Sequence, residues 1–312
     1  MRRLLDHLRQ VRVDLATLTA RVGDHELTAT SPDELRRLLS GALYDRLHAG
    51  RSGGQPATSR DLTDEDLEER LRAVVPHTRT RVTTSVTGTA GDTVVVTLDG
   101  VLVRLPVSGA AGLATGAHVE LLVDCVRPRL SPGFLLVDGS AGHGLDNGPV
   151  LRVYLNVRSS CAAPAVLGAT LTVLEGLGVP YRAKMTSVRV NLPRRDAAVV
   201  YLGRHAWHAA ARIAAAVGPV GGRGEEVSPY TEPLGSGVSV AWEPTDRRPG
   251  YRGLSFGEHR SLVVSTALVE YSRNPTGSLE RMLTNEFDTA GTDPRAPFRE
   301  MTSPELGNIL HL

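Results

Sequence analysis

One residue type capable of acid–base chemistry stands out by its rarity. The chain has 35 basic residues, and all but one are arginine; the single lysine is Lys184. It lies in a predicted strand over residues 180–185, where side chains alternate between two faces. The apolar side chains would face the core, so Arg182 and Lys184 would share the other face, about 7 Å apart at Cα.

This pair of cations could create a general base. A neighbouring guanidinium disfavours the protonated form of a lysine, and a lysine tuned in this way can accept a proton. Arginine cannot do the same, because its guanidinium stays protonated in proteins. The sequence therefore offers Lys184 as a candidate base with Arg182 beside it. The alternative, which is the commoner arrangement, is two solvated cations on an exposed strand edge.

Further arginines bracket the next predicted strand, over residues 197–203. Arg194 and Arg195 precede it, and Arg204 follows it. Arginine binds phosphate through two parallel hydrogen bonds, so these residues are candidates for an anion site. For any one of them alone, the alternative is a solvated loop end with a local Arg–Asp pair.

A third candidate opens a predicted helix at residues 255–260. A helix N-terminus attracts anions through its free N–H groups, and Arg260 would add a planar cation. His259 is a candidate general acid. The alternative is a capped helix start with His259 on the surface, and the sequence is equally compatible with both.

The elements that must position these residues begin with helices and a small sheet. Amphipathic spacing predicts N-terminal helices over residues 4–20, 31–48 and 63–75. The alternating β-branched residues of 80–138 predict a small antiparallel β unit. Asp99-Gly100 is a strong signal for a two-residue hairpin within that unit.

The second half alternates strands and helices, which predicts a C-terminal mixed sheet covered by helices. The expected elements are strands at 151–157, 180–185, 197–203 and 238–242, and helices at 162–176, 205–217 and 258–271. The fold class is therefore α+β, with a helical region 1–78, an antiparallel β unit 79–148 and an α+β region 149–312 that carries the site. The tail after Asn274, rich in Pro, Thr and Asp, is expected to be only partly ordered.

Composition narrows the function classes. The net charge is +1 and aromatic residues make up 4% of the chain, which argues against nucleic-acid binding. The sequence contains no Gly-Lys-Ser/Thr, which excludes a P-loop, and its two cysteines lack metal-type spacing. It also has no apolar run of the ~20 residues that span a membrane, and no signal peptide is indicated. We therefore expect a cytoplasmic protein that binds neither nucleic acid nor membranes.

Seven short segments carry a resemblance that covers about residues 35–272. In order, they are 39–44 (LSGALY), 131–134 (SPGF), 153–156 (VYLN), 179–184 (VPYRAK), 194–201 (RRDAAVVY), 229–231 (PYT) and 255–260 (SFGEHR). Together they resemble the Hop-A type III effector family of bacterial plant pathogens. Related proteins occur in biosynthetic clusters for class V lanthipeptides and thioamitides, where a separate kinase phosphorylates Ser or Thr of a precursor peptide.

The resemblance implies a phosphoserine/phosphothreonine lyase. Such an enzyme removes phosphate by β-elimination and leaves dehydroalanine or dehydrobutyrine, which takes a base, cations for the phosphate and an acid at the leaving oxygen. The roles would be Lys184 as base, His259 or alternatively Tyr201 as acid, Arg182, Arg195, Arg204 and Arg260 as phosphate ligands, and Asn156 and Thr231 in a substrate loop. The reaction requires no metal or organic cofactor.

The partners implied are the phosphorylated precursor peptide and a separate kinase. One position departs from the family pattern, because Glu232 stands where a lysine often follows Tyr-Thr. Effector relatives have no firmly assigned chemistry, so a second interpretation stays open. In it, the chain is a non-catalytic binding module that scaffolds a kinase or captures a leader peptide.

Overall fold

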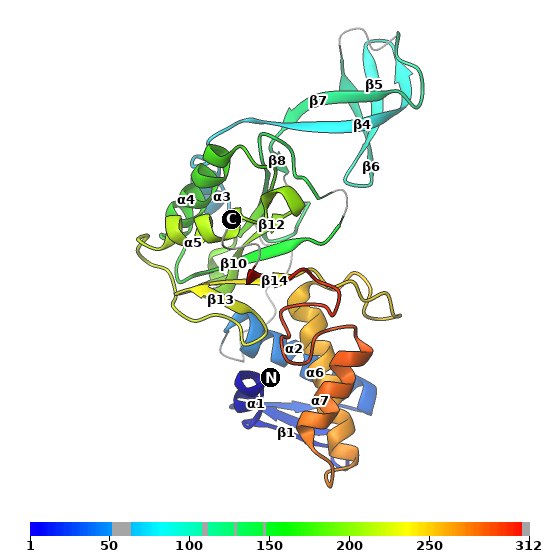
Figure 1. Cartoon of the computed structure of the whole chain (residues 1–312), viewed down its shortest axis with the longest axis vertical. Coiled ribbons are helices and arrows are strands. Elements are labelled where there is room, and N and C mark those ends of the chain that lie inside the picture. The colour runs from blue at the N-terminus through cyan, green and yellow to red at the C-terminus, as the bar shows by residue number, and fades with distance from the viewer. Residues whose placement is uncertain (52–63, 108–111, 128–129, 146–147, 308–312) are drawn as a thin grey trace.

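The chain has the α+β fold that its sequence predicts, built from three antiparallel sheets and the helices around them (Figure 1). The structure is a computed structural model and describes residues 1–51, 64–107, 112–127, 130–145 and 148–307. Among these residues, no helix is both long and apolar enough to cross a membrane.

A seven-stranded sheet forms the centre of the molecule, in the order β13-β14-β10-β12-β11-β9-β8. Its strands are β8 (Val126–Arg127), β9 (Phe134–Asp138), β10 (Leu151–Val157), β11 (Arg182–Thr186), β12 (Arg194–Leu202), β13 (Glu232–Gly235) and β14 (Val238–Trp242). Every neighbouring pair runs antiparallel, so the prediction of a mixed sheet was wrong. β10 and β11 do run in the same direction, but β12 is inserted between them.

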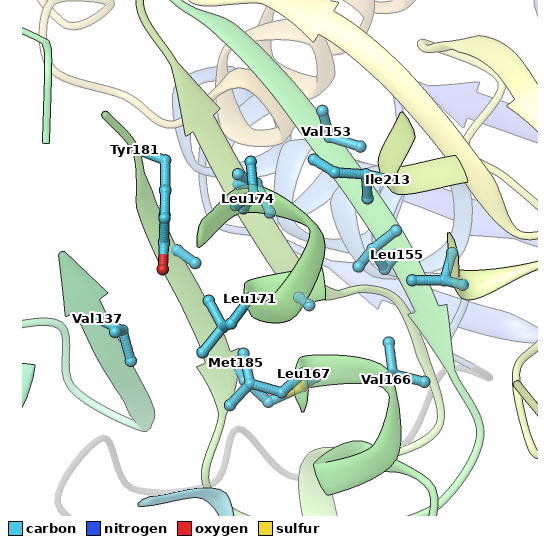
Figure 2. Close-up of a cluster of buried hydrophobic side chains, with 14 of the residues drawn as sticks. Val137, Val153, Leu155, Val166, Leu167, Leu171, Leu174, Tyr181, Met185 and Ile213 are labelled. Atoms are coloured by element: carbon cyan, nitrogen blue, oxygen red, sulfur yellow. The ribbon is translucent and has the colours of Figure 1, made fainter. Parts of the chain in front are cut away.

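Helices cover one face of this sheet. They are α3 (Glu65–Arg72), α4 (Ala163–Leu177) and α5 (Ala209–Val217), each close to its predicted position. Figure 2 shows Leu167, Leu171 and Leu174 of α4 against side chains of the strands, including Leu155 and Met185. This packing buries one side of β11 and leaves the alternate residues for the opposite face. Short 3₁₀ turns, 189–191 and 204–206, flank β12.

The N-terminal segment differs from the predicted helix over residues 4–20. A helix, α1 (Arg2–Leu8), ends after two turns and is followed by a three-stranded sheet of β1 (Val11–Asp14), β2 (Thr19–Val22) and β3 (His25–Thr28). The spacing of the leucines suits a helix. However, Val11 and Val13 are β-branched and alternate with polar residues, which favours a strand.

A second helical group packs against the other face of the central sheet. It contains α2 (Pro32–Leu43), its π-helical continuation η1 (Tyr44–Ala49), α6 (Phe256–Arg273) and α7 (Leu279–Thr289). Ser31 caps α2 by accepting a hydrogen bond from the Glu34 N–H (3.2 Å). The tail after Asn274, which we expect to be only partly ordered, contains α7, and Leu283 and Phe287 of this helix are buried in the core.

A four-stranded sheet projects from the central body, in the order β6-β5-β4-β7 (Figure 1). Its strands are β4 (Arg79–Ala90), β5 (Thr93–Leu98), β6 (Val101–Pro106) and β7 (His118–Asp124). The predicted hairpin is confirmed, since Asp99 and Gly100 join β5 to β6 with φ values of 49° and 78°. β8 and β9, which follow in sequence, are paired into the central sheet.

Candidate functional site

A cavity of about 240 Å³ lies on the face of the central sheet opposite α4, where η1 and the start of α6 meet the strands. Nine of its twelve lining residues carry a polar or charged side chain. The lining residues are Tyr44, His48, Ser131, Pro132, Phe134, Arg152, Tyr154, Lys184, Asp196, Val199, Ser255 and Glu258. A larger groove, of about 830 Å³, lies between β1 and the helices α6 and α7 and holds none of the predicted site residues.

Lys184 reaches this cavity from β11. Its neighbours Ala183 and Met185 are buried in the core beneath α4, so Lys184 and Arg182 share the opposite face, as predicted. The Nζ atom lies 4.5 Å from the ring centroid of Phe134 and 5.8 Å from that of Tyr201. Within the part of the chain that the structure describes, Nζ makes no hydrogen bond or ion pair.

Arg182, in contrast, is bound by two carboxylates. Its guanidinium donates to both oxygens of the buried Asp138 (2.6 and 3.0 Å) and pairs with Asp99 at the hairpin tip (2.8 Å). Burial alone would lower the pKa of Arg182, but the bonds to Asp138 outweigh it and raise that pKa. The side chain therefore ties the projecting sheet to β11, and its charge is balanced before any ligand arrives.

Two residues of β10 that sequence reasoning missed line the cavity beside Lys184. Arg152 is held by Glu243 through Nε and Nη2, and its Cζ lies 5.0 Å from the ring centroid of Tyr201. Tyr154 is 3% exposed, and its hydroxyl has no hydrogen-bond partner among the described residues. Strand alternation alone could have found both, because it places residues 152 and 154 on one face.

A buried charged network forms the floor between η1 and β12. Arg194 donates to both oxygens of Asp196 (2.7 and 2.8 Å), and the Tyr44 hydroxyl donates to the same carboxylate (3.0 Å). Burial alone would raise the pKa of Asp196, but the Arg194 charge holds it well below its ordinary value. This carboxylate is therefore ionised and fully occupied by its neighbours.

His48 completes that floor as a neutral imidazole. Its Nε2 lies 3.7 Å from the Asp196 carboxylate and its Nδ1 lies 3.2 Å from the Ser228 hydroxyl. Burial lowers the pKa of His48 to about 4, although the nearby carboxylate opposes the shift. The Nδ1 atom is hydrogen-bonded and the Nε2 atom faces the Asp196 carboxylate, so the residue packs η1 against the sheet.

The start of α6 reaches the cavity with Ser255 and Glu258 rather than with its predicted acid. These two form a capping box, in which Ser255 accepts from the Glu258 N–H and Glu258 accepts from the Ser255 N–H (2.9 Å). His259 points elsewhere: its Nε2 contacts Asp246 (3.0 Å) and its Nδ1 contacts Arg260. Burial, reinforced by the Arg260 charge, lowers the pKa of His259 to about 4.

Arg260 is fully buried away from Lys184. It donates to the Pro297 carbonyl (2.7 Å) and to Glu300 (2.6 Å), which fastens the C-terminal segment to α6. Arg195 donates to the Leu47 carbonyl (3.1 Å) and pairs with Glu226. Arg204 is exposed beyond the end of β12. The four predicted phosphate ligands therefore do not converge on the cavity.

The two predicted substrate-loop residues hold a loop that runs past β10. Asn156 donates to the Glu226 carbonyl (2.8 Å), and Thr231 donates to the Ser228 carbonyl (2.8 Å). Both are buried and bonded to the backbone, and neither lines the cavity. Among the described residues, no group of three or more His, Cys, Asp or Glu side chains could hold a metal ion.

The comparison with protein families identifies the chain. The model of the HopA1 effector protein family matches residues 125–299, which is more than half of the chain. The chain belongs to this family. The matched region contains Arg152, Tyr154 and Lys184, whereas Tyr44 and His48 of the cavity floor lie outside it.

Two solved structures are similar to this member of the HopA1 family. One is the effector protein from Pseudomonas syringae pv. tomato strain DC3000, which is 14% identical with a TM-score of 0.49, over 88% of this chain and 91% of that chain. The other, from Pseudomonas syringae pv. syringae strain 61, is 13% identical with a TM-score of 0.48, over 86% and 90%. Among curated proteins, none matched the chain.

Proposed function

We propose that this HopA1-family protein is a phosphoserine/phosphothreonine lyase. Its substrate would be a precursor peptide phosphorylated by a separate kinase, as in lanthipeptide or thioamitide biosynthesis, and its product a dehydroalanine or dehydrobutyrine residue. The observation that carries the proposal is the position of Lys184. This only lysine of the chain lines a polar cavity and, in the described structure, has no carboxylate partner.

The reaction needs one proton acceptor at that position. The neutral Lys184 amine takes the Cα proton of the phosphorylated residue, and the Cα–H electron pair becomes the second bond between Cα and Cβ. The Cβ–O bond breaks, and its electron pair leaves with phosphate. When the monoester carries one proton, hydrogenphosphate departs directly. When the monoester is a dianion, a hydrogen-bond donor at the leaving phosphate oxygen lowers the barrier to breaking the Cβ–O bond.

We assign the role of the acid to Tyr201 rather than to His259. Both ring nitrogens of His259 are occupied by Asp246 and Arg260, and the residue does not line the cavity. Tyr201, the alternative acid, does not line the cavity either, but its ring centroid lies 5.8 Å from the Lys184 Nζ and 5.0 Å from the Arg152 Cζ. Of the two acids considered, Tyr201 is therefore the one within reach of the base.

The proposal is tested with a purified precursor peptide that its kinase has phosphorylated. The protein is added with an excess of a small thiol, and the peptide is followed by mass spectrometry. A lyase gives a dehydrated residue that adds the thiol, whereas a phosphatase would give a plain hydroxyl that does not. Phosphopeptide that is retained by the protein but chemically unchanged would favour the binding-module alternative and contradict a lyase.

A further inference from the structure

The cavity contains a buried hydroxyl that the protein itself does not satisfy. Tyr154 is 3% exposed, and its Oη atom has no partner of good hydrogen-bond geometry among the described residues, although the Arg152 guanidinium lies beside it. A buried hydroxyl is normally hydrogen-bonded, because leaving it unpaired costs about 1–3 kcal/mol. Burial raises the pKa of this phenol, so it stays protonated and can donate. An unpaired donor in the wall of a cavity indicates a ligand with an acceptor oxygen.

Arg152 presents a second donor to the same space. Glu243 takes Nε and Nη2, which fixes the plane of the guanidinium. The remaining nitrogen, Nη1, has no hydrogen bond to any residue in the described ranges. Burial alone would lower the pKa of Arg152, but the bonded Glu243 carboxylate raises it, and a guanidinium stays protonated in proteins. A guanidinium oriented on one edge and open on another is suited to binding an oxyanion.

Lys184 supplies the third donor. It comes from β11, two strands from β10, and its Nζ shares the Tyr201 ring with the Arg152 guanidinium. The three side chains therefore meet from two separate segments of the chain. The volume of about 240 Å³ equals that of about eight water molecules at ~30 Å³ each, which leaves room for a phosphoryl group and the side chain that carries it.

The carboxylates in the cavity wall do not make the site one for a cation. Asp196 is neutralised by Arg194 and hydrogen-bonded by Tyr44, and Glu258 accepts the N–H of Ser255. The charge of Asp196 is therefore neutralised within the protein, and one oxygen of the exposed Glu258 is occupied by a backbone N–H. The donor atoms without a hydrogen bond to a described residue are Arg152 Nη1, Tyr154 Oη and Lys184 Nζ, so a tetrahedral oxyanion fits this cavity better than a cation does.

We propose that the cavity is a phosphoryl-binding site in which Arg152 and Tyr154, together with Lys184, hold the phosphate oxygens. The chemical class of the ligand rests on the proposed function, which supplies a phosphate monoester as substrate. The assignment replaces the set of Arg182, Arg195, Arg204 and Arg260 by a pair on β10. Tyr154 in this role is a ligand to the phosphate, distinct from the base.

The test measures binding of inorganic phosphate and of a phosphothreonine peptide by calorimetry, with Tyr154→Phe as the main variant. The variant should bind both ligands about 10–100-fold more weakly, the loss of one hydrogen bond to a charged group. It should also be at least as stable as the wild type, because it removes an unsatisfied buried hydroxyl. Tyr230→Phe is the matched control, since its buried hydroxyl contacts Ser261 outside the cavity, and its binding should be unchanged.

Arg152→Gln serves as a second variant and should lose at least tenfold in phosphate affinity. Unchanged phosphate affinity in both Tyr154→Phe and Arg152→Gln would overturn the site, even if the wild type eliminates phosphate. Conversely, a loss of phosphate binding in these variants would support the site even if the wild type never forms a dehydrated product. The failure of the site and the failure of the lyase are therefore distinguishable.

Discussion

At the residue scale, the arginines of this chain differ in the carboxylates that bind them and in whether they line the cavity. Arg182 and Arg260 pair with buried carboxylates, and both of those partners lie about 40 residues away in sequence. Such pairing does not show in a linear pattern, so the sequence could not reveal that these two arginines are already bound by the protein. Arg152 is also paired, with Glu243, but unlike Arg182 and Arg260 it lines the cavity.

The sequence could predict those features of the site that depend on local backbone geometry. Strand alternation placed Lys184 on the non-core face correctly, because alternation is a local property of the backbone. It could equally have singled out Arg152 and Tyr154. The network of Tyr44, Asp196 and His48 joins segments about 150 residues apart and depends on tertiary packing, so no spacing rule could reveal it.

At the element scale, the first turn of α6 is held against η1 at very short range. Gly257 lies directly against the His48 ring, and a β-carbon at this position would overlap ring atoms on a buried residue. The capping box of Ser255 and Glu258 begins the helix at that point. The position of α6 relative to the cavity therefore depends on the absence of a side chain at residue 257.

Gly257→Ala should accordingly destabilise the protein by about 1–3 kcal/mol, the usual cost of overpacking a buried site. The control is Gly41→Ala in α2, where a β-carbon meets no atom within 4 Å. That change should be neutral or stabilise by about 0.5–1 kcal/mol, because alanine favours a helix interior. Urea unfolding of both variants checks this, and equal stabilities would contradict the packing described for α6.

The elements that begin or end at a short turn or capping motif were the most predictable. The hairpin at Asp99-Gly100 and the helix start at Ser255 both form as expected, because turn and cap geometry are set by adjacent residues. The helix predicted over residues 4–20 failed because leucine spacing and β-branching favour different structures in the same segment. Its outcome was decided by packing against α2 and α6, which a single sequence does not contain.

At the scale of the whole molecule, two buried neutral histidines join the N-terminal and C-terminal segments to the central body. His48 lies under the cavity, and His259 lies in α6 against Asp246. The pKa of each is held at about 4, chiefly by burial, whereas the ordinary value is 6.5. As the pH falls below 6.5, the unfolded chain takes up protons on both residues that the folded protein does not bind.

The free energy of unfolding should therefore fall with the pH, by about 1 kcal/mol for each histidine between pH 6.5 and 5.5. Burial raises the pKa values of Glu286 and Glu300 above 4.5, and these two carboxylates act in the opposite direction as the pH falls. Urea midpoints across pH 7.5 to 5.5 measure the effect. A constant or rising stability over that range would mean that the two imidazoles are not buried as neutral groups.

The central claim is that Lys184 removes a proton, and Lys184→Arg tests it most directly. Arginine preserves the positive charge and approximate length but cannot act as a base near neutral pH. Single-turnover elimination from a kinase-phosphorylated precursor peptide should slow by about 10²–10⁴-fold, while the affinity for the phosphopeptide changes only a few-fold. Dehydrated product forming at close to the wild-type rate would contradict the account and place the base elsewhere in the cavity.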